Sequence, residues 1–277
     1  MQSNSDPSRI ASLSTVDDIR FGTFTILVLA LLAFNFMGTP PDVLTAAVTG
    51  WFEDIGIHQV HDMTISALIW LAMVVPLVLL LYHPTSRVNT VLAPIILVVP
   101  HAVLAFFSGS PLLMPFVIMS LLALLILVFH PAGRSLTQFD RVESIDRPLA
   151  ALYLVGGIPL VFYAGFETAK QLGPVDEHTV FVHFGGMAVG GLFIFLMGAL
   201  AVLRSSDWRF ATVSTGLVAA FLGLVSVRYP ASESSLGVAF GLLLVLWALA
   251  FVTGVFYRRR GEAERVALLD ETVAEST

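Results

Sequence analysis

Long apolar stretches alternate along the chain with short polar connections. A helix rises about 1.5 Å per residue, so an apolar run of about 20 residues spans the hydrocarbon core of a bilayer. Eight segments meet this requirement: Phe21–Gly38, Asp62–Tyr82, Asn89–Ser108, Pro111–His130, Pro148–Phe166, Val180–Leu203, Phe210–Tyr229 and Ser235–Tyr257. The pattern predicts an all-α fold, a polytopic membrane helical bundle with about eight transmembrane helices.

Composition agrees with this fold class. Hydrophobic residues make up 57% of the chain and charged residues 12%, whereas an ordinary soluble domain carries about 25% charged residues. Cysteine is absent, which excludes disulfides, thiolate metal sites and cysteine nucleophiles. The net charge is −6 and the one basic run is Arg258 to Arg260, so no nucleic-acid partner is expected.

The polar connections divide the chain into two halves of similar plan. Superposing the halves at an offset of 122 residues places His61 on His183 and Thr90 on Thr212. This order predicts a tandem 4+4 repeat whose two copies have the same orientation in the membrane. The predicted domains are a cytoplasmic N-terminal tail at 1–20, membrane repeat I at 21–130, a cytoplasmic linker at 131–147, membrane repeat II at 148–257 and a cytoplasmic C-terminal tail at 258–277.

The positive charges predict the orientation, because Lys and Arg collect in cytoplasmic loops. With the N-terminus inside, only Lys170 and Arg228 lie outside, and every other Lys or Arg is cytoplasmic. Shifting the number of spans by one would destroy this asymmetry. We therefore expect a multi-pass protein of the cell membrane with both termini in the cytoplasm.

The first outer loop carries its own apolar segment. Residues Pro41–Phe52 are mostly apolar and end in Trp51 and Phe52. Aromatic residues at the end of a short apolar stretch are typical of a helix that lies at the lipid–water boundary. We expect such a helix here, next to the outer histidines.

Histidine is distributed unevenly across the predicted membrane. Of the seven histidines, His83 and His130 lie at cytoplasmic helix ends. The others lie on or near the outer side and are accompanied by carboxylates. Together they form the candidate metal ligands: His58, His61, Asp62, His101, Glu177, His178 and His183.

Helical geometry predicts which of these side chains meet. His58, His61 and Asp62 share one helical face if the helix starts early enough, because they are three and four residues apart. His178 and His183 are five apart, which does not give a common face. His178 is therefore expected in the loop or at a helix start, near a cap formed by Asp176 or Glu177.

Imidazoles and carboxylates are ligands that suit Zn, Cu and Fe, and helical bundles often combine ligands from different helices. A haem b requires instead one axial histidine from each of two helices at matching depth, with small residues beside the ring. His61 and His183 meet this requirement, and His101, about 10 Å below the outer surface, is a further cofactor-binding candidate. Gly186-x-x-x-Gly190 indicates close helix packing or, alternatively, room for a flat cofactor.

The chain resembles a family of eight-span integral membrane proteins that share the element D-E-H-x4-H-[FY]-x-G-M-A. The resemblance covers most of the membrane region and implies the same helical architecture, without an activity. The matching residues here are Asp176, Glu177, His178, His183, Phe184, Gly186, Met187 and Ala188.

Three hypotheses for function remain open at this point. The first is a redox or metal-handling protein that loses its metal or haem when His61 and His183 are both replaced. The second is a non-enzymatic membrane sensor or assembly subunit with structural histidines, and the third is a transporter of small solutes or ions. The expected partners are the lipid bilayer and, for a sensor or subunit, a membrane or extracytoplasmic protein.

Overall fold

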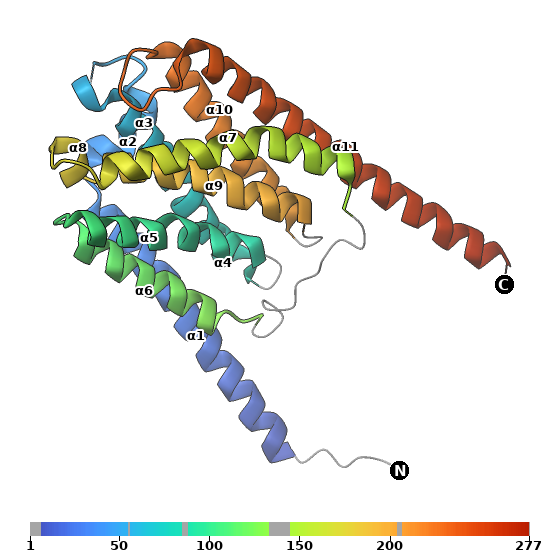
Figure 1. Ribbon diagram of the computed structural model, residues 1–277. Coiled ribbons are helices and arrows are strands. Elements are labelled where there is room, and N and C mark those ends of the chain that lie inside the picture. The colour runs from blue at the N-terminus through green and yellow to red at the C-terminus, as the bar shows by residue number, and fades with distance from the viewer. Residues whose placement is uncertain (1–6, 55, 85–87, 133–144, 204–206, 277) are drawn as a thin grey trace.

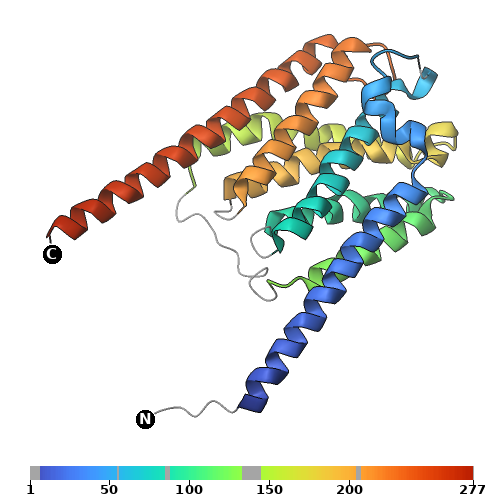
Figure 2. The ribbon, with the colours of Figure 1, turned by 180° about the vertical axis from the view of Figure 1, so that it is seen from behind.

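The computed structural model describes residues 7–54, 56–84, 88–132, 145–203 and 207–276. Within these ranges the regular elements are helices, and no strand occurs. The long helices run side by side between the two ends of a bundle (Figure 1, Figure 2). The prediction of an all-α helical bundle is confirmed.

The predicted spans correspond to long helices. These are α1 (Pro7–Gly38), α5 (Val88–Ser108), α6 (Leu113–Phe129), α7 (Arg147–Gln171), α9 (His183–Leu203), α10 (Trp208–Arg228), α11 (Gly237–Ser276), and a continuous helix made of α3 (Gln59–Leu68), the π-helical η2 (Ile69–Val74) and α4 (Val75–Tyr82). The connections contain α2 (Pro41–Thr49), the 3-10 turn η1 (Gly56–His58) and α8 (Glu177–Val180). Among the described residues, seven helices are long and apolar enough to cross a membrane, and α6 is a shorter apolar helix.

Two helices extend well beyond the predicted spans. α1 begins at Pro7 instead of Phe21, and α11 continues to Ser276 instead of ending at Tyr257. Hydropathy detects only the apolar part of a helix, whereas backbone hydrogen bonds can continue into polar residues. The predicted tails are therefore largely helical, while residues 133–144 of the predicted linker lie outside the described residues.

The second span contains a local widening at η2. Pro76, in the first turn of α4, has no N–H to donate, and its ring would collide with a carbonyl of the preceding turn. The chain adopts π-helical hydrogen bonding over Ile69–Val74, just before this proline. The helix thereby continues without a break from His61 to the far end of the bundle.

The central helix of the bundle is α9, which packs against α7, α10, α5 and α3. Its side chains are almost all buried or half-buried, whereas the peripheral helices keep large apolar side chains exposed. Examples are Ile26 on α1, Phe162 on α7 and Leu246 on α11. Apolar surface of this extent is typical of helices that face lipid.

The glycines of α9 allow α3 to approach closely. A Cβ added to Gly186 would lie 2.6 Å from Ile65 Cδ1, and one added to Gly190 would lie 3.1 Å from Leu68 Cδ1. Side chains of α3 therefore occupy the space beside this Gly-x-x-x-Gly pattern. The glycines serve close helix packing at these positions, as one of the two interpretations predicted.

The two ends of the bundle differ in character. One end carries α2, η1, α8 and the α5–α6 and α10–α11 connections, and we call it the α8 end. α1 starts and α11 finishes at the opposite end, so both ends of the chain lie on one side of the bundle (Figure 1, Figure 2). The predicted apolar helix of the first loop is present as α2, which packs against α3, with the Ser66 hydroxyl donating to the Leu44 carbonyl over 2.9 Å.

Candidate metal centre

Four histidines from four helical elements meet at the α8 end. They are His58 at the end of η1, His61 in α3, His178 in α8 and His183 at the start of α9. The ring centroids of His58 lie 4.7 Å from His178 and 4.4 Å from His183, and those of His61 and His178 are 4.9 Å apart. We call these four side chains the histidine cluster. The sequence predicted all four as candidate ligands.

Local structure explains how residues of unfavourable spacing meet. Asp176 caps α8 by accepting a hydrogen bond from the Thr179 N–H over 2.8 Å, and this bond lowers the pKa of the Asp176 carboxylate. Val182 then adopts a left-handed conformation with φ of 59°. This turn separates α8 from α9 and brings the side chains of His178 and His183 together. On one continuous helix, two residues five apart would point in different directions. The prediction that His178 lies at a capped helix start is confirmed.

Each histidine of the cluster has a buried ring nitrogen with no hydrogen-bond partner among the described residues. These atoms are Nδ1 of His58, Nδ1 of His61, Nε2 of His178 and Nδ1 of His183. Buried polar atoms are nearly always hydrogen-bonded, and an exception calls for an explanation such as an ion. Four such exceptions in one cluster call for a common explanation, and a bound ion is one.

In three of these rings, the second nitrogen, Nε2, faces a carboxylate or hydroxyl oxygen. His58 Nε2 lies 3.3 Å from Glu177 Oε1, and His183 Nε2 lies 3.5 Å from Asp62 Oδ1. His61 Nε2 lies 2.9 Å from Ser234 Oγ. An oxygen that accepts the proton of one ring nitrogen leaves the other nitrogen unprotonated, which is the usual arrangement behind a metal-bound histidine.

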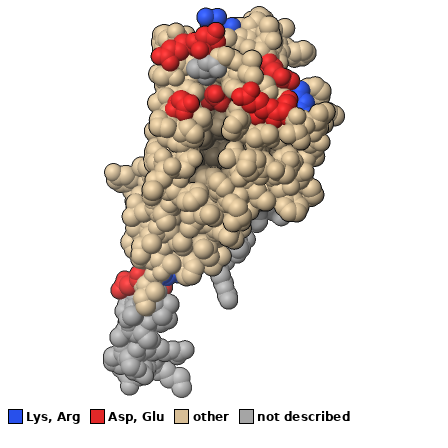
Figure 3. All heavy atoms as spheres, turned by 90° about the vertical axis from the view of Figure 1, so that its left-hand side faces the viewer, with Lys and Arg blue, Asp and Glu red and all other residues tan. Residues whose placement is uncertain are grey.

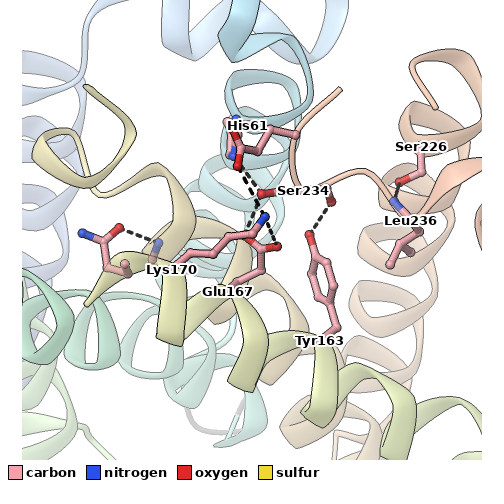
Figure 4. A network of polar contacts seen from close by, with 10 residues as sticks. His61, Tyr163, Glu167, Lys170, Ser226, Ser234 and Leu236 are labelled. Atoms are coloured by element: carbon pink, nitrogen blue, oxygen red, sulfur yellow. Dashed lines mark hydrogen bonds and ion pairs between the residues drawn. The ribbon is translucent and has the colours of Figure 1, made fainter. Parts of the chain in front are cut away.

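The partner of His61 belongs to a longer chain of hydrogen bonds (Figure 4). Ser234 Oγ donates to Glu167 Oε2 over 2.6 Å, and Lys170 Nζ donates to Glu167 Oε1 over 3.1 Å. Since the Ser234 proton goes to Glu167, Ser234 Oγ accepts from His61 Nε2–H. This assigns the tautomer of His61 with a free lone pair on Nδ1.

The donor atoms of three histidines lie close to one another. One nitrogen each from His58, His61 and His178 lies within 4.8 Å of the other two. A tetrahedral ion with bonds of about 2.0 Å holds its nitrogens about 3.3 Å apart. Small side-chain rotations would therefore close the group around an ion, and these residues could hold a metal.

His101 lies apart from the histidine cluster. Its ring stacks on Phe116 with centroids 4.8 Å apart, and its Nδ1 lies 2.7 Å from the Leu97 carbonyl oxygen. Among the described residues, its ring contact is with Phe116 and with none of the four clustered histidines. The structure thus brings His58, His61, His178 and His183 together and keeps His101 in a different environment.

Ser234 is the residue of this region that the sequence did not predict. It lies in the connection between α10 and α11, far from His61 in sequence, and no local motif marks it. Glu167 and Lys170 are three residues apart near the end of α7, and this spacing predicts that they contact each other. It does not predict that they lie near His61. Only the folded chain brings these elements to the cluster.

Comparison with known proteins gives no match: no family model matches the chain, and no curated protein or solved structure does. The class of protein is therefore defined by the fold and the site alone. It is a helical bundle with membrane-compatible apolar helices and a histidine cluster that could hold a metal ion.

Proposed function

We propose that this protein is a multi-pass integral membrane protein that binds one transition-metal ion at its extracytoplasmic surface. The ligands are His58, His61 and His178, with His183 as the fourth. The observation that carries the proposal is that four histidine rings lie together and that each has a buried nitrogen with no hydrogen-bond partner among the described residues. A cluster of structural histidines would be expected to pair these atoms with each other or with nearby polar groups.

The proposed membrane topology has eight crossings, with α6 as the eighth. α6 has 17 residues and is about 25 Å long, close to the thickness of the hydrocarbon core. Both ends of the chain lie on one side of the bundle, and this position agrees with an even number of crossings. The arginine distribution then assigns that side to the cytoplasm and the α8 end to the exterior of the cell membrane.

We also propose that the two four-helix halves arose as a tandem repeat. His61 and His183 are equivalent under the repeat, and their rings stack with centroids 5.5 Å apart and planes at 20°. A twofold axis between two such halves brings equivalent residues to the same depth. The architecture of the eight-span family with the D-E-H-x4-H element is part of this proposal.

The donor set favours Zn²⁺ or a copper ion over harder cations. Neutral imidazole nitrogens suit Zn, Cu, Ni and Fe, whereas Mg²⁺ and Ca²⁺ prefer oxygen ligands. The carboxylates of Asp62 and Glu177 face ring nitrogens, and this position suits them to orient the ligands and to offset the charge of the ion. Exposed acidic side chains also gather around this end of the molecule (Figure 3), where they attract cations from solution.

A haem fits this packing less well than a single ion. Coordination by His61 and His183 would require a flat open space between their rings. The His178 ring lies 4.9 Å from His61 and 5.9 Å from His183, and the His58 ring lies 4.4 Å from His183. The other two histidines thus pack against the rings between which a porphyrin would have to lie.

Elemental analysis combined with an optical spectrum tests the proposal. Detergent-purified protein is stripped with a chelator, incubated with Zn²⁺ or Cu²⁺ and passed through a desalting column. We expect close to one equivalent of metal per chain, with copper giving ligand-field absorption typical of nitrogen coordination. A folded, colourless protein that retains neither metal would overturn the proposal and support a structural role for the histidines.

Replacing Ser234 by alanine tests the hydrogen-bond chain behind His61. The Ser234→Ala variant loses the acceptor that fixes the His61 tautomer, so the metal affinity should fall about tenfold to a hundredfold. Competition with a chromogenic chelator measures this change. Ser232→Ala is the matched control, because Ser232 lies in the same connection and hydrogen-bonds to neither His61 nor Glu167. Equal affinities for the two variants would contradict the assignment.

A further inference from the structure

A cavity of about 290 Å³, partly open to the surface, lies next to the histidine cluster. It is formed by α1, α2, the α3–η2 helix, α5, α6 and the turn between α8 and α9. Asp62 and His183 line it and also belong to the cluster region. Figure 3 looks onto the α8 end of the molecule and shows a hollow in that face. The volume is near the lower limit for sites that bind small organic molecules.

The walls of the cavity are mainly aromatic and apolar. Phe34, Phe116 and Phe181 contribute rings from three different elements, and Met119 contributes a thioether. Aromatic rings and methionine sulfur pack favourably against a flat ring. A strongly polar or charged molecule would lose most of its hydration here, because few of the lining side chains are polar.

Two polar side chains on different walls each leave one atom available to a ligand. Asn35 is only 3% exposed, and its Nδ2 donor has no hydrogen-bond partner among the described residues. His101 Nδ1 donates to the Leu97 carbonyl, because a carbonyl oxygen can only accept, so His101 Nε2 is left as an acceptor. The cavity thus offers one hydrogen-bond donor from α1 and one acceptor from α5.

We propose that this cavity binds the ring of a small hydroxylated aromatic molecule of the hydroquinone class. One hydroxyl donates to His101 Nε2, and the other oxygen accepts from Asn35 Nδ2, while the ring packs against the aromatic walls. A saturated lipid chain fits the apolar walls but leaves both polar groups without partners, which is unfavourable in a buried site. The inference rests on the cavity alone and does not require the proposed metal.

Binding of tetramethylhydroquinone to the full-length purified protein tests this inference. Isothermal titration in detergent under nitrogen should give saturable binding of one molecule per chain, both as isolated and after treatment with a chelator. Decanol, which has one hydroxyl and no ring, should bind at least about tenfold more weakly, because one buried polar group stays unpaired. Because the measurement also uses metal-free protein, its result is independent of the metal proposal.

Variants locate the binding site. His101→Leu and Asn35→Leu should each weaken hydroquinone binding about tenfold, whereas His130→Leu should not, since His130 is a buried histidine that does not line the cavity. Val43→Phe adds bulk at the wall from the peripheral helix α2 and should also reduce binding, without removing a core side chain. Absence of saturable binding, equal binding of decanol, or unchanged binding in His101→Leu, Asn35→Leu and Val43→Phe would overturn the inference.

Discussion

Replacing His61 and His178 together by alanine will abolish stoichiometric metal binding. These residues supply two of the three nitrogens that lie closest together. The free energy of binding at a four-ligand zinc site is about 10–16 kcal/mol, so each ligand contributes about 2.5–4 kcal/mol. Loss of one ligand should weaken binding by about a hundredfold to a thousandfold, and loss of two should leave no metal after desalting. Elemental analysis of the purified variant measures the result directly.

Histidines at the other end of the bundle provide the matched control. His83 follows α4 and His130 follows α6, and neither contacts a ring of the histidine cluster. The His83→Ala/His130→Ala protein should therefore retain one equivalent of metal. Circular dichroism and gel filtration would establish that both double variants are folded. Full metal content in the folded His61→Ala/His178→Ala protein would show that the ion uses another site.

Much of the helical architecture could be predicted because a bilayer imposes a simple length requirement. The predicted span Phe210–Tyr229 and the observed α10, Trp208–Arg228, differ by at most two residues at either end. Polar extensions of helices do not follow from apolarity, so the helical course of α1 before Phe21 was missed. The π-helical turn at Ile69–Val74 depends on how the chain accommodates Pro76 within its surroundings, which hydropathy does not report.

The candidate site could be predicted where sidedness and helical spacing were sufficient. His58 and His61 lie one helical turn apart and at the same end of the bundle as His178 and His183, so their proximity followed from topology. His101 shows the limit of this approach: its depth along α5 was predictable, but the direction that its side chain takes around the helix axis was not. The contact of Ser234 with His61 requires the α10–α11 connection to fold over α3, and no property of the local sequence encodes that placement.

Replacing Gly223 by leucine will destabilise the protein by separating α10 from α11. A Cβ at Gly223 would lie 2.6 Å from the Gly241 carbonyl oxygen and 2.8 Å from Val245 Cγ2, and a Cβ at Gly241 would lie 2.7 Å from the Gly223 carbonyl oxygen. A side chain can rotate away from a clash, but a backbone oxygen can move only with its helix. We expect a loss of about 3 kcal/mol, the upper part of the usual range for overpacking, measured as a lower midpoint of thermal unfolding by circular dichroism.

Gly165→Leu on α7 is the matched control, and its effect should have the opposite sign. An added Cβ at Gly165 meets no atom within 4 Å, and leucine is a better helix former than glycine by about 0.8 kcal/mol. Gly223→Leu should also weaken metal binding, because Gly223 lies about 8 Å along α10 from the connection that holds Ser234 against His61. Equal unfolding midpoints for the two leucine variants would contradict the packing argument. A destabilised Gly223→Leu protein with unchanged metal affinity would instead separate the α10–α11 contact from the support of the metal centre.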